Sequence, residues 1–203
     1  MAPVIPDPDA IRAFDSEAAF EAWLRVNHDK ASELYLRIYK KGSDVPTVTY
    51  AQAVDVALCW GWIDGLKKGY DESSFLQRFT PRKPRSIWSR INCQHVERLT
   101  AAGRMTPHGQ KHIDAAKADG RWDAAYAGAS KMTVPDDLLA AIEAEPKAFE
   151  MFQTLNKQNL YALAFRTHNV KTPAVRAKKV AGFVEMLARG ETLYPNGRKA
   201  EKP

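Results

Sequence analysis

The sequence lacks the features that mark disulfide-rich and membrane-spanning proteins. Its 203 residues contain only two cysteines, Cys59 and Cys93, which have no C-x-x-C spacing. No stretch approaches the roughly 18 uncharged apolar residues that a spanning helix needs. Residues 1–10 have neither a basic start nor an apolar run, so no signal peptide is indicated. We therefore expect two free thiols, no membrane insertion and a cytoplasmic location.

Motifs for the common catalytic chemistries are also missing. The sequence contains no G-x-G-x-x-G or Walker phosphate loop and no G-x-S-x-G nucleophile elbow. His108-x-x-x-His112 has a spacing that metals can use, but no glutamate follows His108, and Cys93-x-His95 is the nearest source of a third ligand. We therefore expect no metal and no cofactor, and we favour a non-catalytic protein over an enzyme.

Acidic residues are absent from one stretch of the N-terminal half, residues 73–96. The whole chain has 30 basic and 24 acidic residues, a net charge of +6. Five basic side chains fall in the acid-free stretch: Arg78, Arg82, Lys83, Arg85 and Arg90. Three aromatic residues lie within it, Phe75, Phe79 and Trp88, and Trp60 and Trp62 lie just upstream. A basic segment of this kind indicates an anionic partner.

The predicted elements indicate an α+β fold, a small antiparallel sheet flanked by helices and followed by an all-helical C-terminal module. Residues 34–40 alternate between apolar and polar side chains, as a half-buried strand does. Residues 62–68 and 74–80 are separated by a short polar turn and predict an antiparallel hairpin. Helix caps are predicted at Ser16, Thr49, Ser86 and Thr106.

The order of these elements also gives domain boundaries. Helices alone are predicted after the linker, over residues 135–144, 146–155, 158–167 and 173–189. We expect a loose segment 1–14, an α+β domain 15–127, a linker 128–133, a helical module 134–193 and a disordered tail 194–203.

The helix predicted after Ser86 is the sharpest candidate site. A helix start offers unpaired N–H groups and the positive end of a dipole to an anion, and two nearby arginines strengthen such a site. The candidate anion ligands here are Arg78, Arg82, Lys83, Arg85, Ser86, Ser89 and Arg90. In the alternative interpretation Ser86 only caps the helix, while the arginines lie in solvent or pair with Asp64, Asp71 or Glu72.

The aromatic residues also have two interpretations. Trp60, Trp62, Phe75, Phe79 and Trp88 could stack on the bases of single-stranded nucleic acid, next to the basic side chains. Aromatic residues at these spacings also suit a hydrophobic core.

Two regions of the chain resemble the bacterial YdeI/OmpD-associated family. The first contains WGWIDGLKKGYDESSFLQRFTPRKPRSIWSRIN and LTAAGRMTPHGQKHIDAAKADGRWDAAY. The second, FEMFQTLNKQNLYALAFRTHNVKTPAVRAKKVAGFVEMLARG, is similar to the helical module labelled a bacteriocin-protection domain. The resemblance covers most of residues 15–190 and implies an α+β part, a helical part and no established catalytic residues. The family label suggests a periplasmic setting, against which the missing export signal argues.

A second acid-free stretch, residues 151–184, includes the start of the last predicted helix. Its basic residues Arg176, Lys178 and Lys179 match a basic motif of the family module and are further candidate anion ligands, although the acidic residue of that motif is missing. Arg176 falls on the apolar face, near the helix start, where a cation is unfavourable. We expect it to be partly buried and to bind an acid, a carbonyl or an anion; the alternative is that its stem lies on apolar surface with its head in water.

These features favour a non-catalytic module with a basic surface that binds polyanions such as nucleic acid, in a family associated with stress responses. The first alternative is a small-molecule enzyme or sensor that holds an anionic ligand at Arg82, Arg85 and Ser86. The second is a protein–protein adaptor, which the family label suits. The sequence indicates no oligomeric state.

Overall fold

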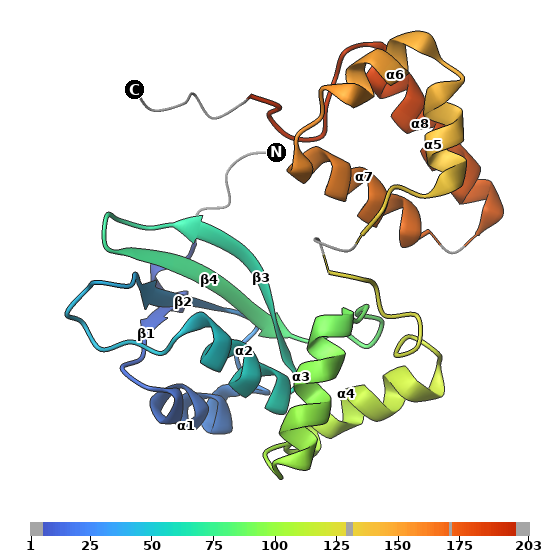
Figure 1. The fold of residues 1–203 in the computed structure, drawn as a ribbon. Helices are drawn as coiled ribbons and strands as arrows, with labels where there is room; N and C mark the ends of the chain where they lie inside the picture. Colours follow the sequence, from blue (N-terminus) through green and yellow to red (C-terminus); the bar gives the residue numbers. More distant parts are fainter. Residues whose placement is uncertain (1–5, 129–131, 171, 198–203) are drawn as a thin grey trace. The chain divides into compact units, whose positions relative to one another are not determined.

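Two units make up the chain, divided between Ala125 and Tyr126. The computed structural model describes residues 6–128, 132–170 and 172–197, and each unit has a hydrophobic core of its own (Figure 1). The first unit combines a sheet with helices and the second contains helices, so the predicted α+β fold with a helical C-terminal part is confirmed. None of the helices in the described ranges combines the length and apolar composition that a bilayer crossing requires.

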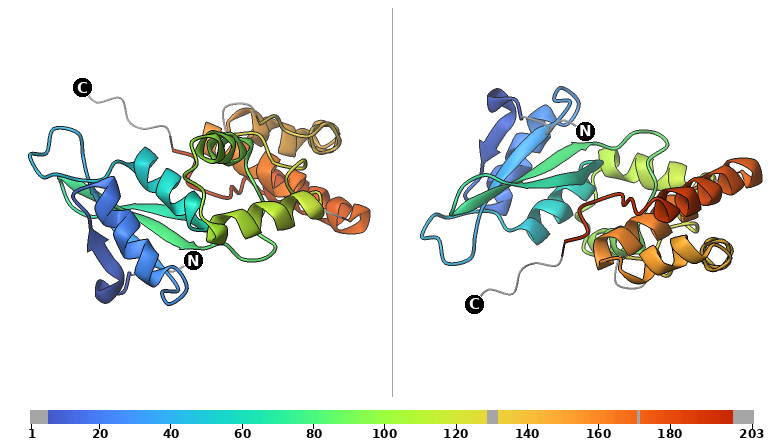
Figure 2. Two further views of the ribbon diagram at one scale, coloured as in Figure 1. Left: turned by 90° about the horizontal axis from the view of Figure 1, so that it is seen from below. Right: turned by 90° about the horizontal axis from the view of Figure 1, so that it is seen from above.

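A four-stranded sheet in the order β1-β2-β4-β3 organises the N-terminal unit. β1 runs parallel to β2, and β4 is antiparallel to both of its neighbours. Helices α1 and α2 cover one face of the sheet, and α3 and α4 lie at one of its ends (Figures 1 and 2). The elements, in chain order, are the 3-10 turn η1 (Pro8–Ala10), β1 (Ile11–Ala13), α1 (Glu17–Asn27), β2 (Leu34–Tyr39), α2 (Tyr50–Cys59), β3 (Trp62–Gly69), β4 (Ser74–Pro81), α3 (Arg90–Ala101) and α4 (Pro107–Ala118).

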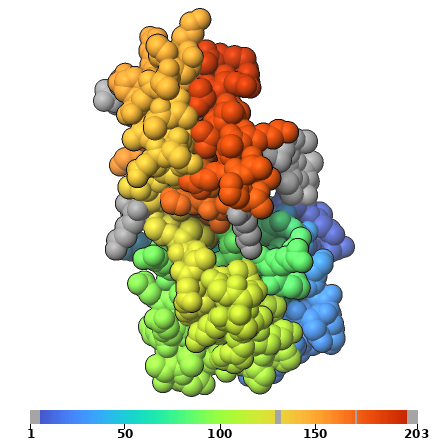
Figure 3. Space-filling view, turned by 90° about the vertical axis from the view of Figure 1, so that its right-hand side faces the viewer, coloured from blue at the N-terminus to red at the C-terminus, as the bar shows by residue number. Residues whose placement is uncertain are grey.

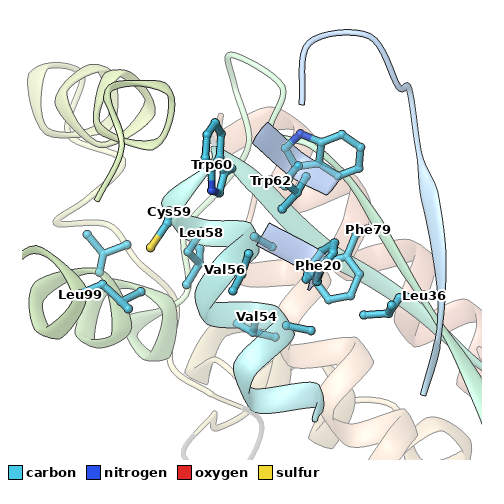
Figure 4. Packing of buried hydrophobic residues seen from close by; sticks show 14 of the residues in the cluster. Phe20, Leu36, Val54, Val56, Leu58, Cys59, Trp60, Trp62, Phe79 and Leu99 are labelled. Atoms are coloured by element: carbon cyan, nitrogen blue, oxygen red, sulfur yellow. The ribbon is translucent and has the colours of Figure 1, made fainter. Parts of the chain in front are cut away.

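Helix α2 lies at the centre of this unit, in contact with α1, β3, α3 and α4. Because it is covered on several sides, it is apolar over most of its surface. Val56, for example, is fully buried, and it packs in one core with Phe20 of α1, Leu36 of β2 and Phe79 of β4 (Figure 4). Cys59 and Cys93 are buried free thiols, as predicted, and burial raises the pKa of each to about 11.

Most of the local predictions for this unit are confirmed. Ser16 caps α1, and its Oγ accepts a hydrogen bond from the N–H of Ala19 at 3.3 Å. Thr49 and Gln52 form the reciprocal capping box at the start of α2, and Thr106 caps α4. Strands β3 and β4 form the predicted antiparallel hairpin.

The predicted start of the helix after Ser86 is wrong. Helix α3 begins at Arg90, and Ser89 is its cap, with its Oγ accepting the N–H of Asn92 at 3.1 Å. Ser86 closes a turn instead, because its Oγ accepts the N–H of Lys83 at 3.1 Å. Both serines suit a cap, but the non-helical stretch between them carries Trp88 into the core, where its side chain is 2% exposed.

Two segments predicted to be loose are ordered where the structure describes them. Ile11–Ala13 pairs with β2 as the short strand β1. At the other end, Tyr194 exchanges two hydrogen bonds of 3.0 Å with the side-chain amide of Asn159, and the amide of Asn196 donates to the carbonyl of Thr154. Side-chain amides that pair with backbone groups in this way fix the chain. The remaining parts of the two predictions, residues 1–5 and 198–203, lie outside the described residues.

The C-terminal unit contains four helices in its described residues, close to the four predicted. Their apolar sides form one core that includes Leu138, Ile142, Leu163, Phe183 and Leu187. The helices are α5 (Asp136–Glu143), α6 (Pro146–Gln153), α7 (Lys157–His168) and α8 (Pro173–Ala188).

Candidate functional site

A cavity of about 480 Å³ lies in the N-terminal unit where four segments meet: the end of α1, the turn between α2 and β3, the end of β4 and the first half of α4. Nitrogen-bearing side chains dominate its lining, and Asp29 is the one carboxylate among the described residues that line it. We call it the histidine cavity. Figure 3 shows the side of this unit on which the yellow-green surface of α4 and the blue surface around the α1 end lie next to each other. Its lining includes three histidines, two cations and one tryptophan whose contacts are described below: His28, Trp60, Arg82, His108, Lys111 and His112.

Two glycines bring α4 close enough to form the cavity wall. Gly61 has a φ of +73°, and a Cβ there would lie 2.7 Å from the carbonyl oxygen of His108. A Cβ on Gly109 would lie 2.7 Å from the carbonyl oxygen of Leu58. Thr106, which caps α4, also donates its hydroxyl to the carbonyl of Cys59 at 2.6 Å. The first turn of α4 is therefore seated on the end of α2, and this seating positions His108 and His112.

The rings of His28 and His108 are hydrogen-bonded to each other across the cavity. Nε2 of His28 lies 3.0 Å from Nδ1 of His108. His28 is the C-cap of α1, and its Nδ1 lies 3.2 Å from the carbonyl oxygen of Leu24. The carbonyl of His28 in turn accepts the indole N–H of Trp62 at 3.0 Å. Both rings are half-buried, so the pair is held by the fold and still borders open space.

The surroundings of His108 and His112 favour their neutral forms. Partial burial lowers the pKa of His108, and the nearby His28 and Lys111 lower it further, while Asp29 raises it. Burial also lowers the pKa of His112, with further contributions from Lys111 and Arg82. Desolvation and like charges both oppose a second positive charge. Two imidazoles of the cavity, those of His108 and His112, are therefore biased toward their neutral forms next to permanent cations.

Aromatic rings form the apolar part of the wall. Trp60 is stacked on His108, with 13° between the ring planes and 5.6 Å between the centroids. The guanidinium of Arg82 lies 3.6 Å from the centroid of Trp88, and its Nη1 donates to the carbonyl of Ile87. Arg82 is only 4% exposed, which is rare for an arginine outside a specific site. A cation stacked on an indole in this way is stabilised by the ring quadrupole.

The other basic residues of the acid-free stretch have separate roles. Arg78 forms an ion pair with Glu33 at 2.7 Å, and Arg90 donates to the carbonyl of Ala125 at 3.3 Å. Lys83 and Arg85 are exposed, and their side chains have no bond or ion pair to the described residues. The residues suggested as alternative partners have other contacts: Asp71 pairs with Arg37, Asp64 accepts the hydroxyl of Tyr50, and the carbonyl of Glu72 accepts Lys40.

The aromatic residues proposed to stack on bases are mostly core residues. Trp62 is 1% exposed, Phe79 0% and Trp88 2%, so no base could reach their faces in this conformation. Trp60 is 9% exposed and lines the histidine cavity, and the half-buried Phe75 lies under the ammonium of Lys67 at 4.0 Å. For Trp62, Phe79 and Trp88 the alternative interpretation as a hydrophobic core is therefore the correct one.

Arg176 is partly buried and bonded to an acid and a carbonyl, as the sequence analysis expects. Its Nε and Nη2 donate to the two carboxylate oxygens of Asp137 at 2.6 and 2.8 Å, and its Nη1 donates to the carbonyl of Thr167 at 3.0 Å. The pair connects α8 with α5 and explains how a cation is tolerated near a helix start. Of the other two candidates, Lys178 is exposed and the ammonium of Lys179 lies 5.8 Å from the ring centroid of Phe183.

His95 belongs to an ion-pair cluster away from the cavity. Its Nδ1 lies 2.7 Å from the carboxylate of Asp55, which also accepts Arg98 at 2.6 Å. The part of the chain that the structure describes contains no group of three or more His, Cys, Asp or Glu side chains suited to a metal ion.

Two further depressions have no imidazole among the described residues that line them. One of about 880 Å³ lies beside β2, the start of α2 and β3, but the ammonium of its Lys40 is bonded to the carbonyls of Asp71 and Glu72. One of about 390 Å³ lies between α6 and α8 and has a mainly apolar lining that includes Met151 and Leu187. Of these three, the histidine cavity is the one whose lining combines imidazoles with cations.

Two important residues of the cavity, Lys111 and His28, were not indicated by the sequence, and His28 is the more distant from the others along the chain. It follows α1 and lies 80 positions before its partner His108, so no local spacing connects the two. The pair His108-x-x-x-His112 was visible in the sequence, and Gly61 and Gly109 are the residues that could have indicated a close approach of α4.

Comparison with known protein families gives one match in each unit. Residues 131–190 match the family described as "Bacteriocin-protection, YdeI or OmpD-Associated", which confirms the resemblance for the C-terminal part. Residues 12–112, which we had placed in the same family, match a different one, described as "Domain of unknown function (DUF8412)". No curated protein and no solved structure matches the chain. Every described residue that lines the histidine cavity falls within residues 12–112, so the candidate site lies in the region that matches this family of unknown function.

Proposed function

We propose that the N-terminal unit binds a small anionic ligand in the histidine cavity. The observation that carries this proposal is the charge of the lining: the two permanent cations Arg82 and Lys111 against the single carboxylate of Asp29. A volume of about 480 Å³ is within the range of sites for small molecules. The stacked rings of Trp60 and His108 add an apolar wall for the rest of the ligand.

The geometry favours a small anion over the polyanion that the sequence suggested first. A polymer of phosphates needs a row of accessible cations. In the acid-free stretch Arg78 is paired with Glu33 and Arg82 is buried, and in the second stretch Arg176 is paired with Asp137. One enclosed cluster of donors suits a single phosphate or carboxylate group better than a strand of them.

Replacement of Lys111 is a direct test of the site. It is exposed, and its side chain has no hydrogen bond or ion pair to the residues that the structure describes, so its removal should leave stability nearly unchanged. Lys83 is a matched control, because it is an equally exposed lysine of the same unit that does not line the cavity. The two variants Lys111→Met and Lys83→Met remove the same charge and keep a similar apolar stem.

The experiment is a titration with inorganic phosphate, sulfate and citrate, followed by thermal unfolding and by calorimetry. Binding to the folded protein raises the melting temperature with ligand concentration. We expect at least one anion to stabilise the wild type, Lys111→Met to bind it about fivefold more weakly and Lys83→Met to bind it equally well. A shallow salt dependence is expected, since few contacts are involved.

Two results would contradict the proposal. The first is that none of the three anions raises the melting temperature. The second is an equal loss of affinity in both lysine variants, which would indicate a general effect of surface charge. Tight binding of single-stranded nucleic acid with a steep salt dependence would favour the polyanion function instead.

A further inference from the structure

The hydrogen bonds of His28 and His108 determine which ring nitrogens carry protons. A backbone carbonyl can only accept, so Nδ1 of His28, 3.2 Å from the oxygen of Leu24, must be its donor. A neutral imidazole has one donor and one acceptor nitrogen. Nε2 of a neutral His28 is therefore an acceptor, and Nδ1 of His108, 3.0 Å away, must donate to it. The proton of a neutral His108 is thus on Nδ1, and its Nε2 has a free lone pair.

These two hydrogen bonds form the same arrangement as in sites where a second group orients a catalytic histidine. In such sites the hydrogen bond on one ring nitrogen fixes the tautomer and leaves the other nitrogen available as a base. Here the carbonyl of Leu24 fixes His28, and His28 fixes His108. The stacking of Trp60 on His108 restricts the ring further.

The pair of His28 and His108 can also be protonated on Nε2 of His108 without the loss of either hydrogen bond. When Nε2 of His108 is protonated, Nδ1 of that ring still donates to His28, and His28 still donates to Leu24. Protonation of His28 on Nε2 would instead bring two N–H groups face to face. His28 and Lys111 oppose a charge on His108, and Asp29 favours one. Arg82 after β4 and His112 on α4 are the remaining titratable groups of the lining.

We propose that His108 is a general base in the histidine cavity, acting through Nε2 on a small anionic substrate whose acidic O–H or C–H group faces it. In this step the bond from the substrate atom to hydrogen breaks, an Nε2–H bond forms, and the electron pair remains on the substrate. The ammonium of Lys111 is placed to stabilise the negative charge that develops. His28 is a positioning residue, because it acts on the substrate through His108. A positioned base of this kind contributes roughly 10²- to 10⁴-fold to a rate.

The ligand class in this inference rests on the proposed function, but the hydrogen-bond arrangement does not. The first measurement therefore uses the free protein. Nuclear magnetic resonance of ¹⁵N-labelled histidines distinguishes a protonated from a bare ring nitrogen. We expect His108 to carry its proton on Nδ1, whereas a histidine in water prefers Nε2.

Two variants of His28 separate positioning from packing. In His28→Gln the amide oxygen can take the place of Nε2 and accept from His108, so the unusual tautomer should remain. In His28→Leu no acceptor is left, and the ratio of the tautomers should shift by roughly fivefold toward Nε2–H. A proton on Nε2 of His108 in the wild type, or equal tautomer ratios in both variants, would overturn the proposal.

The second measurement is calorimetry of inorganic phosphate binding in two buffers that differ in their heat of ionisation. A bound anion favours the protonated form of a neighbouring imidazole, so we expect proton uptake in the wild type and in His28→Gln. The uptake should be lost in His108→Gln and kept in His112→Gln. Uptake that is kept in His108→Gln and lost in His112→Gln would assign the base to His112 and refute the proposal. If phosphate does not bind, the calorimetry uses sulfate or citrate instead. If none of the three anions binds, the proposed function fails, while the tautomer measurement still decides whether His108 has the required lone pair.

Discussion

Two histidine contacts in the N-terminal unit show how a partner determines what an imidazole can do. Nδ1 of His95 lies 2.7 Å from the carboxylate of Asp55, whereas Nδ1 of His108 lies 3.0 Å from another imidazole, that of His28. A carboxylate stabilises a protonated ring, and a second imidazole beside a lysine does not. The first contact is therefore suited to an ion pair and the second to a neutral base.

The two contacts also differ in what they connect. Asp55 is on α2, while His95 and Arg98 are on α3, so the ion-pair cluster ties two helices together on their surfaces. The His28–His108 contact ties the end of α1 to the start of α4 and borders a cavity. Each contact holds helices in place, but the second also leaves Nε2 of His108 with no partner among the residues that the structure describes. Three sets of substitutions test this difference between the two histidine contacts.

The largest effect is expected for Gly61→Ala, which affects the histidine cavity and leaves the ion-pair cluster intact. The new Cβ would be strained by the positive φ and would lie 2.7 Å from the carbonyl of His108. Backbone strain of about 1–2 kcal/mol and overpacking of about 1–3 kcal/mol should combine to a loss of about 3 kcal/mol. The free energy of unfolding in urea measures this loss.

Gly103→Ala is the matched control for that measurement. Gly103 has a φ of +67°, but a Cβ there would meet nothing within 4 Å, so only the backbone strain of about 1 kcal/mol should appear. The difference between the two variants then reports the close approach of α4. Equal losses would mean that α4 is not seated on Gly61 as described.

An intermediate effect is expected for Asp55→Asn, which breaks the ion-pair cluster and leaves the histidine cavity intact. Burial alone would raise the pKa of Asp55, but hydrogen bonds from Arg98 and His95 outweigh burial and lower it below its ordinary value of 3.8. The side chain of Asp55 is 14% exposed, so its loss should cost about 1–2 kcal/mol at neutral pH. Asp123→Asn, at an exposed carboxylate of the same unit, is the control and should change stability little.

The pH dependence of this effect has a definite sign. Because the pKa of Asp55 is lower in the folded than in the unfolded protein, its contribution is complete above the unfolded value and is lost as pH falls through the folded value. The difference between wild type and Asp55→Asn should be constant above about pH 5 and shrink in more acidic solution. A difference that grows as the pH falls below 4 would contradict the assignment of the ion pair.

The fold could be predicted from the sequence wherever a local signal determines it. Thr49-x-x-Gln52 fixes the start of α2 because both of its hydrogen bonds form within four residues. The hairpin of β3 and β4 follows from two apolar runs and the turn between them. The start of α3 was placed three residues too early because Ser86 and Ser89 are equally good caps. Only the burial of Trp88, a tertiary effect, distinguishes them.

The candidate site could be predicted only in part, for the same reason. Arg82, His108 and His112 stand out in the sequence, but His28 and Lys111 become meaningful only when α1 and α4 meet. Likewise, Arg176 was recognised as a cation in an unfavourable position, yet its partner Asp137 is 39 residues away. Charge and periodicity indicate which residues need a partner, and the packing of distant segments decides which partner they receive.

The smallest effect is expected for two charged residues at the edge of the histidine cavity, Lys111 and Asp29. Replacing them should shift the pKa of His108 in opposite directions. Partial burial is the first cause of the lowered pKa of His108, followed by His28 and Lys111, and Asp29 acts in the opposite sense. Lys111→Met removes a positive charge and should therefore raise the pKa of His108. Asp29→Asn removes a negative charge and should lower it. Both residues are exposed, so solvent weakens their influence and both shifts should diminish in high salt.

The titration of the histidine ring signals by nuclear magnetic resonance measures these shifts, and His95 serves as an internal reference because its partner is Asp55. Opposite shifts at His108 with an unchanged His95 would show that the cavity responds to its own charges. Shifts of the same sign in both variants, or an equal response of His95, would mean that Lys111 and Asp29 act through a general change in protein charge. In that case the contrast between the two histidine contacts would no longer be a property of their nearest partners.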